Sequence, residues 1–381
     1  MLSQEEVKRY SRQILIPELG REGQEKLKHA KVLVIGAGGL GSPILLYLAA
    51  AGVGNIGLID FDRIDESNLQ RQILFTTNEV GLFKAEIARN KLKALNPLIE
   101  VEAYLQHLNS GNVLEILSRY DLVMDGSDNL ATRYLVNDAC VIMEKPLVYG
   151  AIFQFEGQVS VFNFLQDDGI RGPNYRDLFP QPPPPELVPS CSEGGVLGVL
   201  PGIIGSMMAN EAIKMITGIG KTLSGKLMIF DSFDFTSHRI TIKVHPDNPV
   251  TGKTVGNFTL IDYEAFCNPR PAQNIAVEEI SAETLQSWIQ QGKPFQLIDV
   301  REKTEFELVN LGGLNIPLSQ LKENIHLLKK DTLMVIHCKS GQRSMVAARQ
   351  IIQDFHFEKV CHLKGGLLQW KEKIAPEMDM Y

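Results

Sequence analysis

The sequence predicts an α/β protein with two unequal domains, each built on a mostly parallel sheet. Short apolar stretches typical of buried strands alternate with helical stretches over residues 1–245, and such alternation implies parallel strands covered by helices. A glycine-rich turn follows the first of these strands. After an interval with four prolines, the alternation begins again near residue 276. A chain of 381 residues has room for two to three domains of ordinary size.

The first domain is expected to begin with a helix and then to alternate strands with helices. Ser3 and Glu6 form a capping box that opens the N-terminal helix. A second helix follows the glycine turn, and a third, over residues 79–95, ends at Asn96 because Pro97 comes next. Apolar runs and period-two alternation indicate strands in KVLVIG, IGLID, IEVEAYL and DLVMDGSDN.

The second domain is expected to be a smaller α/β unit. Residues 246–275 are predicted to be a linker, because their four prolines and weak periodicity favour neither helix nor strand. Residues 276–381 then contain strands in FQLIDV, LMVIHC and KVCHL, separated by helical stretches.

The composition limits the classes of function. Net charge is −7, 44% of residues are hydrophobic and 22% are charged, with no block of Lys or Arg, which argues against a general nucleic-acid binder. The polar N-terminus shows no signal peptide. The longest uncharged run has 17 residues and is interrupted by Pro201, so it is shorter than the ~20 residues of a membrane helix. We therefore expect a cytoplasmic protein without a membrane partner. The odd number of cysteines fits a reducing compartment. The five cysteines are Cys140, Cys191, Cys267, Cys338 and Cys361.

A nucleotide site is predicted at the glycine turn VIGAGGLG. Gly36, Gly38, Gly39 and Gly41 lie between a strand and a helix, where small residues let backbone N–H groups approach a phosphate. Asp60 ends the next strand and suits a ribose hydroxyl. Taken alone, these residues indicate a dinucleotide cofactor, so an NAD-dependent oxidoreductase is one interpretation.

Further charged residues favour chemistry at a triphosphate instead. Arg71, with Asn68 nearby, and Lys84 supply groups that neutralise phosphate charge. Asp128 at a strand end supplies a carboxylate for Mg²⁺. A nicotinamide requires none of these groups.

The motifs RYSRQILIPELG, GAGGLGSP, LIDFDRIDESNLQRQ, GLFKAE, DGSDN and EGQVSVF resemble those of the MoeB/ThiF sulfur-carrier adenylyltransferases, relatives of ubiquitin-activating enzymes. The resemblance covers residues 1–245. It implies ATP-dependent adenylation of the C-terminal Gly-Gly carboxylate of a small ubiquitin-like protein, carried out by a homodimer. It assigns Mg²⁺ to Asp128, phosphates to Arg71 and Lys84, and the ribose and a nearby phosphate to Asp60 and Asn68. Arg12 would act across the dimer interface.

One departure from that family concerns a structural zinc held by two Cys-x-x-Cys pairs. Asn174 and Asp177 stand where the first pair is expected, and the stretch VHPDNPVTG, where the second is expected, has no cysteine. Four thiolates are what make such a site strong. We therefore expect no zinc.

A reactive thiol is predicted at Cys338, which ends a strand directly before a helix. Backbone N–H groups of the loop, the helix dipole and Arg343 would favour the thiolate. With LIDVREKTEF upstream and LKGGLLQW downstream, residues 276–381 resemble rhodanese sulfurtransferases, in which this thiolate carries sulfur as a persulfide. The resemblance makes Asp299 and Arg301 structural or loop-orienting, and Cys361 reads as a strand-core residue. The persulfide loop would comprise Cys338, Lys339, Ser340, Gly341, Gln342 and Arg343, one residue shorter than a phosphatase loop and suited to the smaller sulfur atom.

Together the two resemblances predict that the chain adenylates a carrier protein and then converts its carboxylate to a thiocarboxylate. The sulfur would come from a cysteine desulfurase or thiosulfate. Molybdenum cofactor synthesis, thiamine synthesis, cysteine synthesis and tRNA thiolation all remain open as pathways. The alternatives are an NAD-dependent oxidoreductase and a scaffold that only binds a ubiquitin-like partner.

Cys191 follows the proline run PQPPPPELVPS and precedes Gly194 and Gly195. A proline run favours an extended spacer, and glycines permit a hinge. The adenylyltransferase resemblance places here a cysteine that attacks the adenylate or resolves an acyl-persulfide. We expect Cys191 to bond covalently to the carrier; the alternative is a structural loop thiol.

Overall fold

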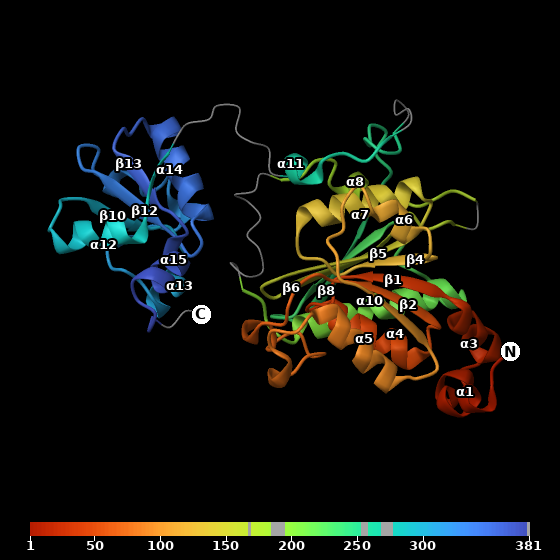
Figure 1. The fold of residues 1–381 in the computed structure, drawn as a ribbon. Coiled ribbons are helices and arrows are strands. Elements are labelled where there is room, and N and C mark those ends of the chain that lie inside the picture. Colours follow the sequence, from red (N-terminus) through yellow and green to blue (C-terminus); the bar gives the residue numbers. More distant parts are fainter. Residues whose placement is uncertain (167–168, 184–194, 253–257, 268–276, 379–381) are drawn as a thin grey trace. The chain divides into compact units, whose positions relative to one another are not determined.

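The structure is a computed structural model that describes all residues except 167–168, 184–194, 253–257, 268–276 and 379–381. The chain divides into two compact units, Met1–Pro269 and Arg270–Tyr381. Each unit has its own sheet and its own hydrophobic core (Figure 1).

The first unit is built on an eight-stranded sheet in the order β3-β2-β1-β4-β5-β6-β7-β8. The five strands from β3 to β5 are parallel, as the alternation of strands and helices predicted, whereas β6 to β8 continue the sheet as an antiparallel meander. The strands are β1 (Lys31–Ile35), β2 (Asn55–Ile59), β3 (Glu100–Tyr104), β4 (Leu122–Asp125), β5 (Leu147–Phe153), β6 (Glu156–Phe162), β7 (Lys226–Asp231) and β8 (Thr236–Thr241).

Helices cover both faces of this sheet (Figure 1). The capping box of Ser3 and Glu6 opens α1 as predicted, and α5 ends before Pro97. The helix expected from residue 79 begins only at Lys84, because residues 77–79 form a separate 3₁₀ turn. The helices are α1 (Gln4–Arg9), α2 (Ser11–Ile14), α3 (Gly20–His29), α4 (Gly41–Ala51), α5 (Lys84–Leu95), α6 (Val113–Leu117), α7 (Leu130–Ile142), α8 (Tyr175–Leu178), α10 (Leu200–Thr217) and α11 (Tyr263–Cys267).

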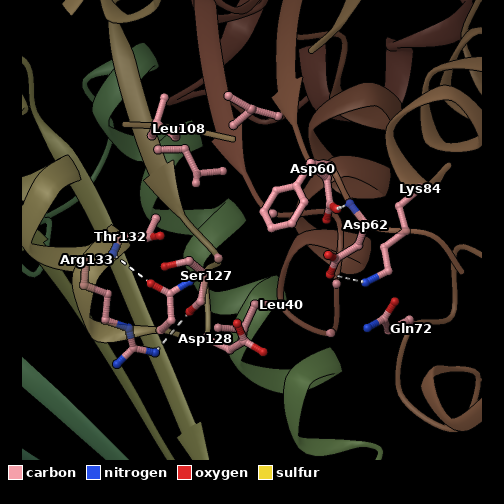
Figure 2. A pocket seen from close by; sticks show the side chains of 18 of the residues that line it. Leu40, Asp60, Asp62, Gln72, Lys84, Leu108, Ser127, Asp128, Thr132 and Arg133 are labelled. Atoms are coloured by element: carbon pink, nitrogen blue, oxygen red, sulfur yellow. Dashed lines mark hydrogen bonds and ion pairs between the residues drawn. The ribbon is translucent and has the colours of Figure 1, made fainter. Parts of the chain in front are cut away.

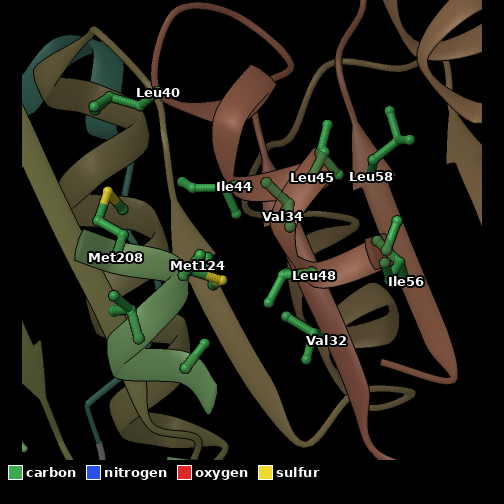
Figure 3. Packing of buried hydrophobic residues seen from close by; sticks show 14 of the residues in the cluster. Val32, Val34, Leu40, Ile44, Leu45, Leu48, Ile56, Leu58, Met124 and Met208 are labelled. Carbon is green, nitrogen blue, oxygen red and sulfur yellow. The ribbon is translucent and has the colours of Figure 1, made fainter. Parts of the chain in front are cut away.

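Two apolar clusters fill the space on either side of the sheet. On one side, α4 and α10 pack against β1, β2 and β4, with side chains from all of these elements interleaved (Figure 3). On the other side, α6, α7 and α11 cover a second cluster. Residues 200–210 of the long uncharged run form the first part of α10, and α10 contributes buried side chains to the first core. Within the described residues, no helix is long and apolar enough to cross a membrane.

Part of the stretch expected to be a linker packs on the first unit. Helix α11 contacts α7, and the hydroxyl of Tyr263 donates to Oδ2 of Asp138 at 2.7 Å. The same carboxylate accepts two bonds from the guanidinium of Arg176, at 2.6 and 2.8 Å. This buried triad ties a segment near residue 263 to the body of the unit, whose boundary falls at Pro269.

A second hydrogen-bonded cluster lies where the resemblance placed a zinc. The Asp177 carboxylate accepts from the backbone N–H groups of Asn174 and His245, both at 2.8 Å, and from Nδ2 of Asn248 at 2.7 Å. Asn248 has no exposed surface, and Asn174 is nearly as deeply buried. We call Asn174, Asp177, His245 and Asn248 the polar clasp, because they join residues near 175 to residues near 246.

The second unit is a five-stranded parallel sheet in the order β11-β10-β12-β13-β9. Its strands in FQLIDV, LMVIHC and KVCHL are those predicted from the sequence. The elements are β9 (Glu278–Ile280), α12 (Ala282–Gln290), β10 (Gln296–Asp299), α13 (Lys303–Leu308), β11 (Leu314–Asn315), β12 (Met334–His337), α14 (Gln342–Phe355), β13 (Val360–Leu363) and α15 (Gly366–Lys373).

Candidate functional site

The glycine turn after β1 is shaped by two positions that admit no side chain. Gly36 has φ of 85°, in the left-handed region, and its N–H donates to the carbonyl of Ile59 at 2.9 Å. A Cβ on Gly41 would lie 1.9 Å from the carbonyl oxygen of Gly36. The chain therefore folds back on itself and starts α4 at the carboxyl edge of the sheet, where a pocket opens beside Gly38 and Gly39.

Asp60 forms one wall of this pocket, just after β2 (Figure 2). Its Oδ2 accepts from the N–H of Ala37 at 2.8 Å, and its Oδ1 accepts from the N–H of Asp62 at 2.9 Å. Burial raises the pKa of Asp60, although the nearby Lys84 ammonium and both backbone bonds act in the opposite direction. The carboxylate is thus fixed between the glycine turn and the loop that leads to Lys84.

Lys84 brings a positive charge to the same wall. It begins α5, is only 5% exposed, and places Nζ 3.0 Å from Oδ2 of Asp62 (Figure 2). Asp62 is more than half exposed, so the ion pair reaches from the interior to the pocket mouth. Arg71 also lines the pocket, and its Nη1 donates to the carbonyl of Ser67 at 3.0 Å.

The opposite wall follows β4 and carries two further carboxyl groups, those of Asp125 and Asp128. Asp128 is exposed and lines the pocket. Asp125 lies beneath it, fully buried, and its Oδ1 accepts from the N–H and the hydroxyl of Ser127 at 2.9 and 2.6 Å. Burial raises the pKa of Asp125, opposed mainly by the charge of Arg133, whose Nη2 donates to the carbonyl of Ser127 at 3.1 Å (Figure 2).

The structure therefore brings together most of the residues expected to bind a nucleotide. Three expected residues lie elsewhere: Gly41 packs beneath the turn, Asn68 caps a 3₁₀ turn through a 3.3 Å bond from the N–H of Asp65, and Arg12 is exposed on α2. Those that line the pocket are Gly36, Gly38, Gly39, Asp60, Arg71, Lys84 and Asp128.

Sequence reasoning missed several lining residues. Most follow the ends of β2 and β4, and their position at the carboxyl edge of a parallel sheet was the signal available for finding them. The ring centroids of Phe61 and His107 are 4.7 Å apart at this edge. The residues with polar or aromatic side chains that were not predicted include Phe61, Asp62, Gln72, His107, Ser127, Thr132 and Arg133.

The second candidate site surrounds Cys338, which follows β12 and has no exposed surface. Its Sγ accepts from the N–H of Gly341 at 3.2 Å and from the N–H of Ser344 at 3.4 Å. Gly341 has φ of 92° and caps α14, so the loop can curl around the sulfur. The N-terminus of a 14-residue helix and two N–H groups thus point at the sulfur, so a negative charge formed there would be hydrogen-bonded.

Helix α15 supports this loop from outside. The N–H groups of Leu367 and Leu368 donate to the carbonyls of Cys338 and Lys339 at 2.9 and 3.0 Å. A Cβ on Gly366 would lie 2.3 Å from the carbonyl oxygen of Cys338, so glycine is required for this approach. Within the loop, Lys339 is half-buried, whereas Ser340 and Gln342 are exposed.

Two arginines near this loop have partners that the sequence did not indicate. Arg343 forms a two-point ion pair with Glu305 of α13, at 2.6 and 2.8 Å. Arg301 is fully buried and pairs with Asp299 at 2.6 Å, and it also donates to the carbonyl of Val309. These bonds hold the segment after β10 in place.

The other described cysteines differ from Cys338 in their surroundings. Burial raises the pKa of Cys361 to about 12 and that of Cys267 to about 11, and it raises that of Cys140 as well. These thiols stay protonated at neutral pH. Cys191 lies outside the described residues.

Comparison with protein families gives two matches. The ThiF family matches residues 10–250, and the rhodanese-like domain matches residues 281–373. The chain is similar over its whole length to the probable adenylyltransferase/sulfurtransferase MoeZ of Mycobacterium tuberculosis, with 47% identity over 386 residues, which are 96% of that protein. It is also similar to the adenylyltransferase and sulfurtransferase MOCS3 of Drosophila grimshawi, with 42% identity over all of this chain and 87% of that one.

Other relatives match the first unit. The sulfur carrier protein adenylyltransferase of Thermus thermophilus is 55% identical over 268 residues, 70% of this chain and 99% of that protein. Among solved structures, PaaA has a TM-score of 0.54 and 27% identity, covering 63% of this chain and 75% of PaaA. MccB of E. coli has a TM-score of 0.53 and 25% identity, covering 63% of this chain and 70% of MccB.

Proposed function

The chain belongs to the ThiF family and ends in a rhodanese-like domain, so it is an adenylyltransferase joined to a sulfurtransferase, and we propose that its substrate is a ubiquitin-like sulfur-carrier protein ending in Gly-Gly. ATP would activate the terminal carboxylate as an acyl-adenylate, and sulfur from Cys338 would convert it to a thiocarboxylate. The observation that carries this proposal is the presence of two separate sites, one built for phosphates and one built for a thiolate, in a single chain.

In the adenylation step, the carrier carboxylate attacks the α-phosphorus of ATP and pyrophosphate leaves. The glycine turn and α4 would hold phosphate oxygens, and Asp60 would bind the ribose, with Asn68 assigned to the ribose or a nearby phosphate. Arg71 and Lys84 would neutralise the charge that moves onto pyrophosphate.

The ion pair between Lys84 and Asp62 supports this assignment. An incoming phosphate would replace the exposed Asp62 as the partner of Lys84, so the buried ammonium always keeps an anion beside it. Asp128 supplies the exposed carboxylate that Mg²⁺ requires, and the metal would neutralise phosphate charge when bound. Arg12, exposed on α2, would serve the site of a second copy in a homodimer.

In the sulfur-transfer step, the Cys338 thiolate first takes a sulfur atom from a donor such as thiosulfate or a cysteine desulfurase. Cys191 would attack the adenylate, forming a thioester as AMP leaves. The terminal sulfur of the Cys338 persulfide then displaces Cys191, giving an acyl disulfide. A first equivalent of an external thiol attacks Sγ of Cys338, which releases the carrier thiocarboxylate and leaves a mixed disulfide on Cys338. A second equivalent then releases the Cys338 thiol and forms the external disulfide.

Mg²⁺-dependent ATP–pyrophosphate exchange in the presence of a Gly-Gly-ended carrier tests the first step. Asp128→Ala should reduce the exchange by about 100-fold, as loss of a group that stabilises transferring charge does. Glu115→Ala, which removes an exposed carboxylate from α6, is the matched control and should leave it unchanged. Undiminished exchange in Asp128→Ala would refute the assignment of Asp128 to the metal.

A further inference from the structure

The Cys338 thiol lies at one end of a row of hydrogen-bonding side chains that reaches the surface of the second unit. Its Sγ is 3.7 Å from Oγ of Ser344, and this hydroxyl is 3.4 Å from Nδ1 of His362. Nε2 of the same ring is 3.4 Å from Oε1 of Glu279. The row therefore joins a sulfur with no exposed surface to a carboxylate that is 40% exposed.

The fold places these side chains together without any special loop. Strands β13 and β9 pair in parallel, and their register sets His362 directly opposite Glu279. Ser344 is in the first turn of α14, which packs on β13. His362 is almost fully buried between them. One strand pair and one helix thus align the row.

The position of the protons on the His362 ring follows from its two neighbours. The hydrogen bond from Lys364, 3.2 Å away, lowers the pKa of Glu279, so that carboxyl group is ionised and can only accept. Nε2 therefore carries a hydrogen, and Nδ1 is left as an acceptor facing the Ser344 hydroxyl. That hydroxyl also lies 3.0 Å from the carbonyl oxygen of Gly341, so its hydrogen can turn from one acceptor to the other.

The ring is neutral before the reaction, so Nδ1 can accept a proton from the Ser344 hydroxyl. Burial lowers the pKa of His362, and the charges of Arg349 on α14 and Lys364 after β13 lower it further, while the hydrogen bond and charge of Glu279 on β9 oppose them. These are the charged groups that face the ring from the elements around it. The ring is consequently neutral at pH 7, with an ionised carboxylate in place to stabilise the protonated form.

We propose that Ser344, His362 and Glu279 form a proton relay that removes the proton of the Cys338 thiol before sulfur transfer. This inference rests on the proposed role of Cys338. The S–H bond breaks and its proton passes to Oγ of Ser344, while the hydroxyl proton of Ser344 passes to Nδ1 of His362. The electron pair stays on sulfur, nothing is oxidised, and the proton at Nε2 leaves through Glu279 to solvent.

The relay gives the proton of the buried Cys338 thiol a path to solvent. A thiol with no exposed surface cannot give its proton directly to water, and sulfur acceptance requires the thiolate. Because the N–H groups of Gly341 and Ser344 already face the sulfur, the negative charge left behind is hydrogen-bonded as soon as it forms. Ser344 takes the proton from Cys338 directly, whereas His362 and Glu279 act through Ser344.

The test is the pH dependence of persulfide formation in single-turnover reactions of the full chain with thiosulfate, followed by the added mass of one sulfur atom. In His362→Gln, the pH of half-maximal rate should rise by about one unit, so the rate at pH 7 falls about tenfold, and the rates should converge with wild type near pH 10. Glu279→Gln should shift the profile in the same direction by a smaller amount. Glu278→Gln, on the same strand, should give the wild-type profile.

Two outcomes would overturn the relay. One is a His362→Gln profile that superimposes on wild type; the other is a rate reduced by the same factor at every pH, because a purely structural role has no pH dependence. If His362→Gln does not fold, the pH profile of Glu279→Gln tests the relay instead. The Glu279 side chain is partly exposed, so its replacement should not prevent folding. Cys338→Ser separates the two proposals: persulfide formed without Cys338 refutes its role, whereas unchanged relay variants refute only the relay.

Discussion

At the scale of single residues, the nucleotide pocket depends on charges held at different depths. Lys84 is buried and bonded to Asp62, whereas Arg71 and Asp128 are at the surface of the pocket. A buried charge cannot move away from its site, and its hydrogen bonds are little screened by salt. In the proposed adenylation step, Lys84 would therefore define where a phosphate binds, and Arg71 and Asp128 would adjust to the nucleotide.

Lys84→Met should lower ATP–pyrophosphate exchange by about 100-fold, because one preorganised cation is lost where charge develops on pyrophosphate. The variant should still fold, since the partner left behind, Asp62, is more than half exposed. Lys93→Met is the matched control: it removes a cation from the same helix, where Lys93 pairs with Glu100 at 3.0 Å on the surface. Equal losses in both variants would mean that Lys84 acts only through the net charge.

Cys191→Ser should separate activation from sulfur transfer. ATP–pyrophosphate exchange and persulfide formation on Cys338 should stay at wild-type rates, because neither step uses Cys191. Thiocarboxylate formation should fall at least tenfold, since a serine hydroxyl is a poor substitute for a thiolate. Single-turnover mass spectrometry of the carrier measures this; formation at the wild-type rate, with no adduct trapped on the native enzyme, would make Cys191 a bystander.

At the scale of elements, the polar clasp joins two segments of the first unit through hydrogen bonds, as a metal ion joins the segments that carry its ligands. It joins the segment that begins α8 to the residues after β8, and its central amide, Nδ2 of Asn248, bonds both Asp177 and Asn174. Oδ1 of the Asn248 side chain also accepts from the N–H groups of Val250 and Thr251. Buried polar groups that satisfy one another in this way are costly to break.

Asn248→Ala should lower the free energy of unfolding of the first unit by about 1–3 kcal/mol. The buried N–H of Val250 loses its acceptor, and the Asp177 carboxylate loses one of its donors. Urea unfolding measures this, and Asn90→Ala, at an exposed position of α5, is the control with a change below about 0.5 kcal/mol. Chelator treatment should not change the midpoint, and metal analysis should find zinc well below one equivalent. Stoichiometric zinc that survives the chelator would contradict both expectations.

The sequence predicted an element well where the contacts that form it join residues close together in the chain. Strands such as β1 and β12, the glycine turn and the Cys338 loop are specified by neighbouring residues, so their patterns were sufficient. The Tyr263–Asp138 bond joins residues 125 positions apart, and Arg343 pairs with Glu305, 38 positions away. Contacts of that kind depend on the whole fold, and no local pattern indicates them. The antiparallel end of the sheet was missed for the same reason.

At the scale of the whole molecule, the chain is two folding units with one reaction divided between them. Each unit has its own core, and the phosphate site and the thiolate site each lie within one unit. Neither set of described site residues draws on the other unit. The two half-reactions should therefore be separable by substitution.

Asp128→Ala should load sulfur onto Cys338 at the wild-type rate while losing exchange, and Cys338→Ser should retain exchange while losing persulfide. Neither variant should make thiocarboxylate from ATP and thiosulfate. The measurement is both partial reactions on each purified variant. A loss of exchange greater than about threefold in Cys338→Ser would show that the units depend on each other for chemistry.

In its proposed role as the persulfide carrier, Cys338 has a burial that would also affect how long the enzyme keeps its sulfur. A persulfide enclosed by the backbone of its loop is sheltered from the small thiols of the cell, which would otherwise reduce it within the idle time between carriers. Donor and carrier must both reach this enclosed sulfur, so at saturating donor the rate should level off at the rate of access. Slower transfer would then accompany longer retention of the bound sulfur.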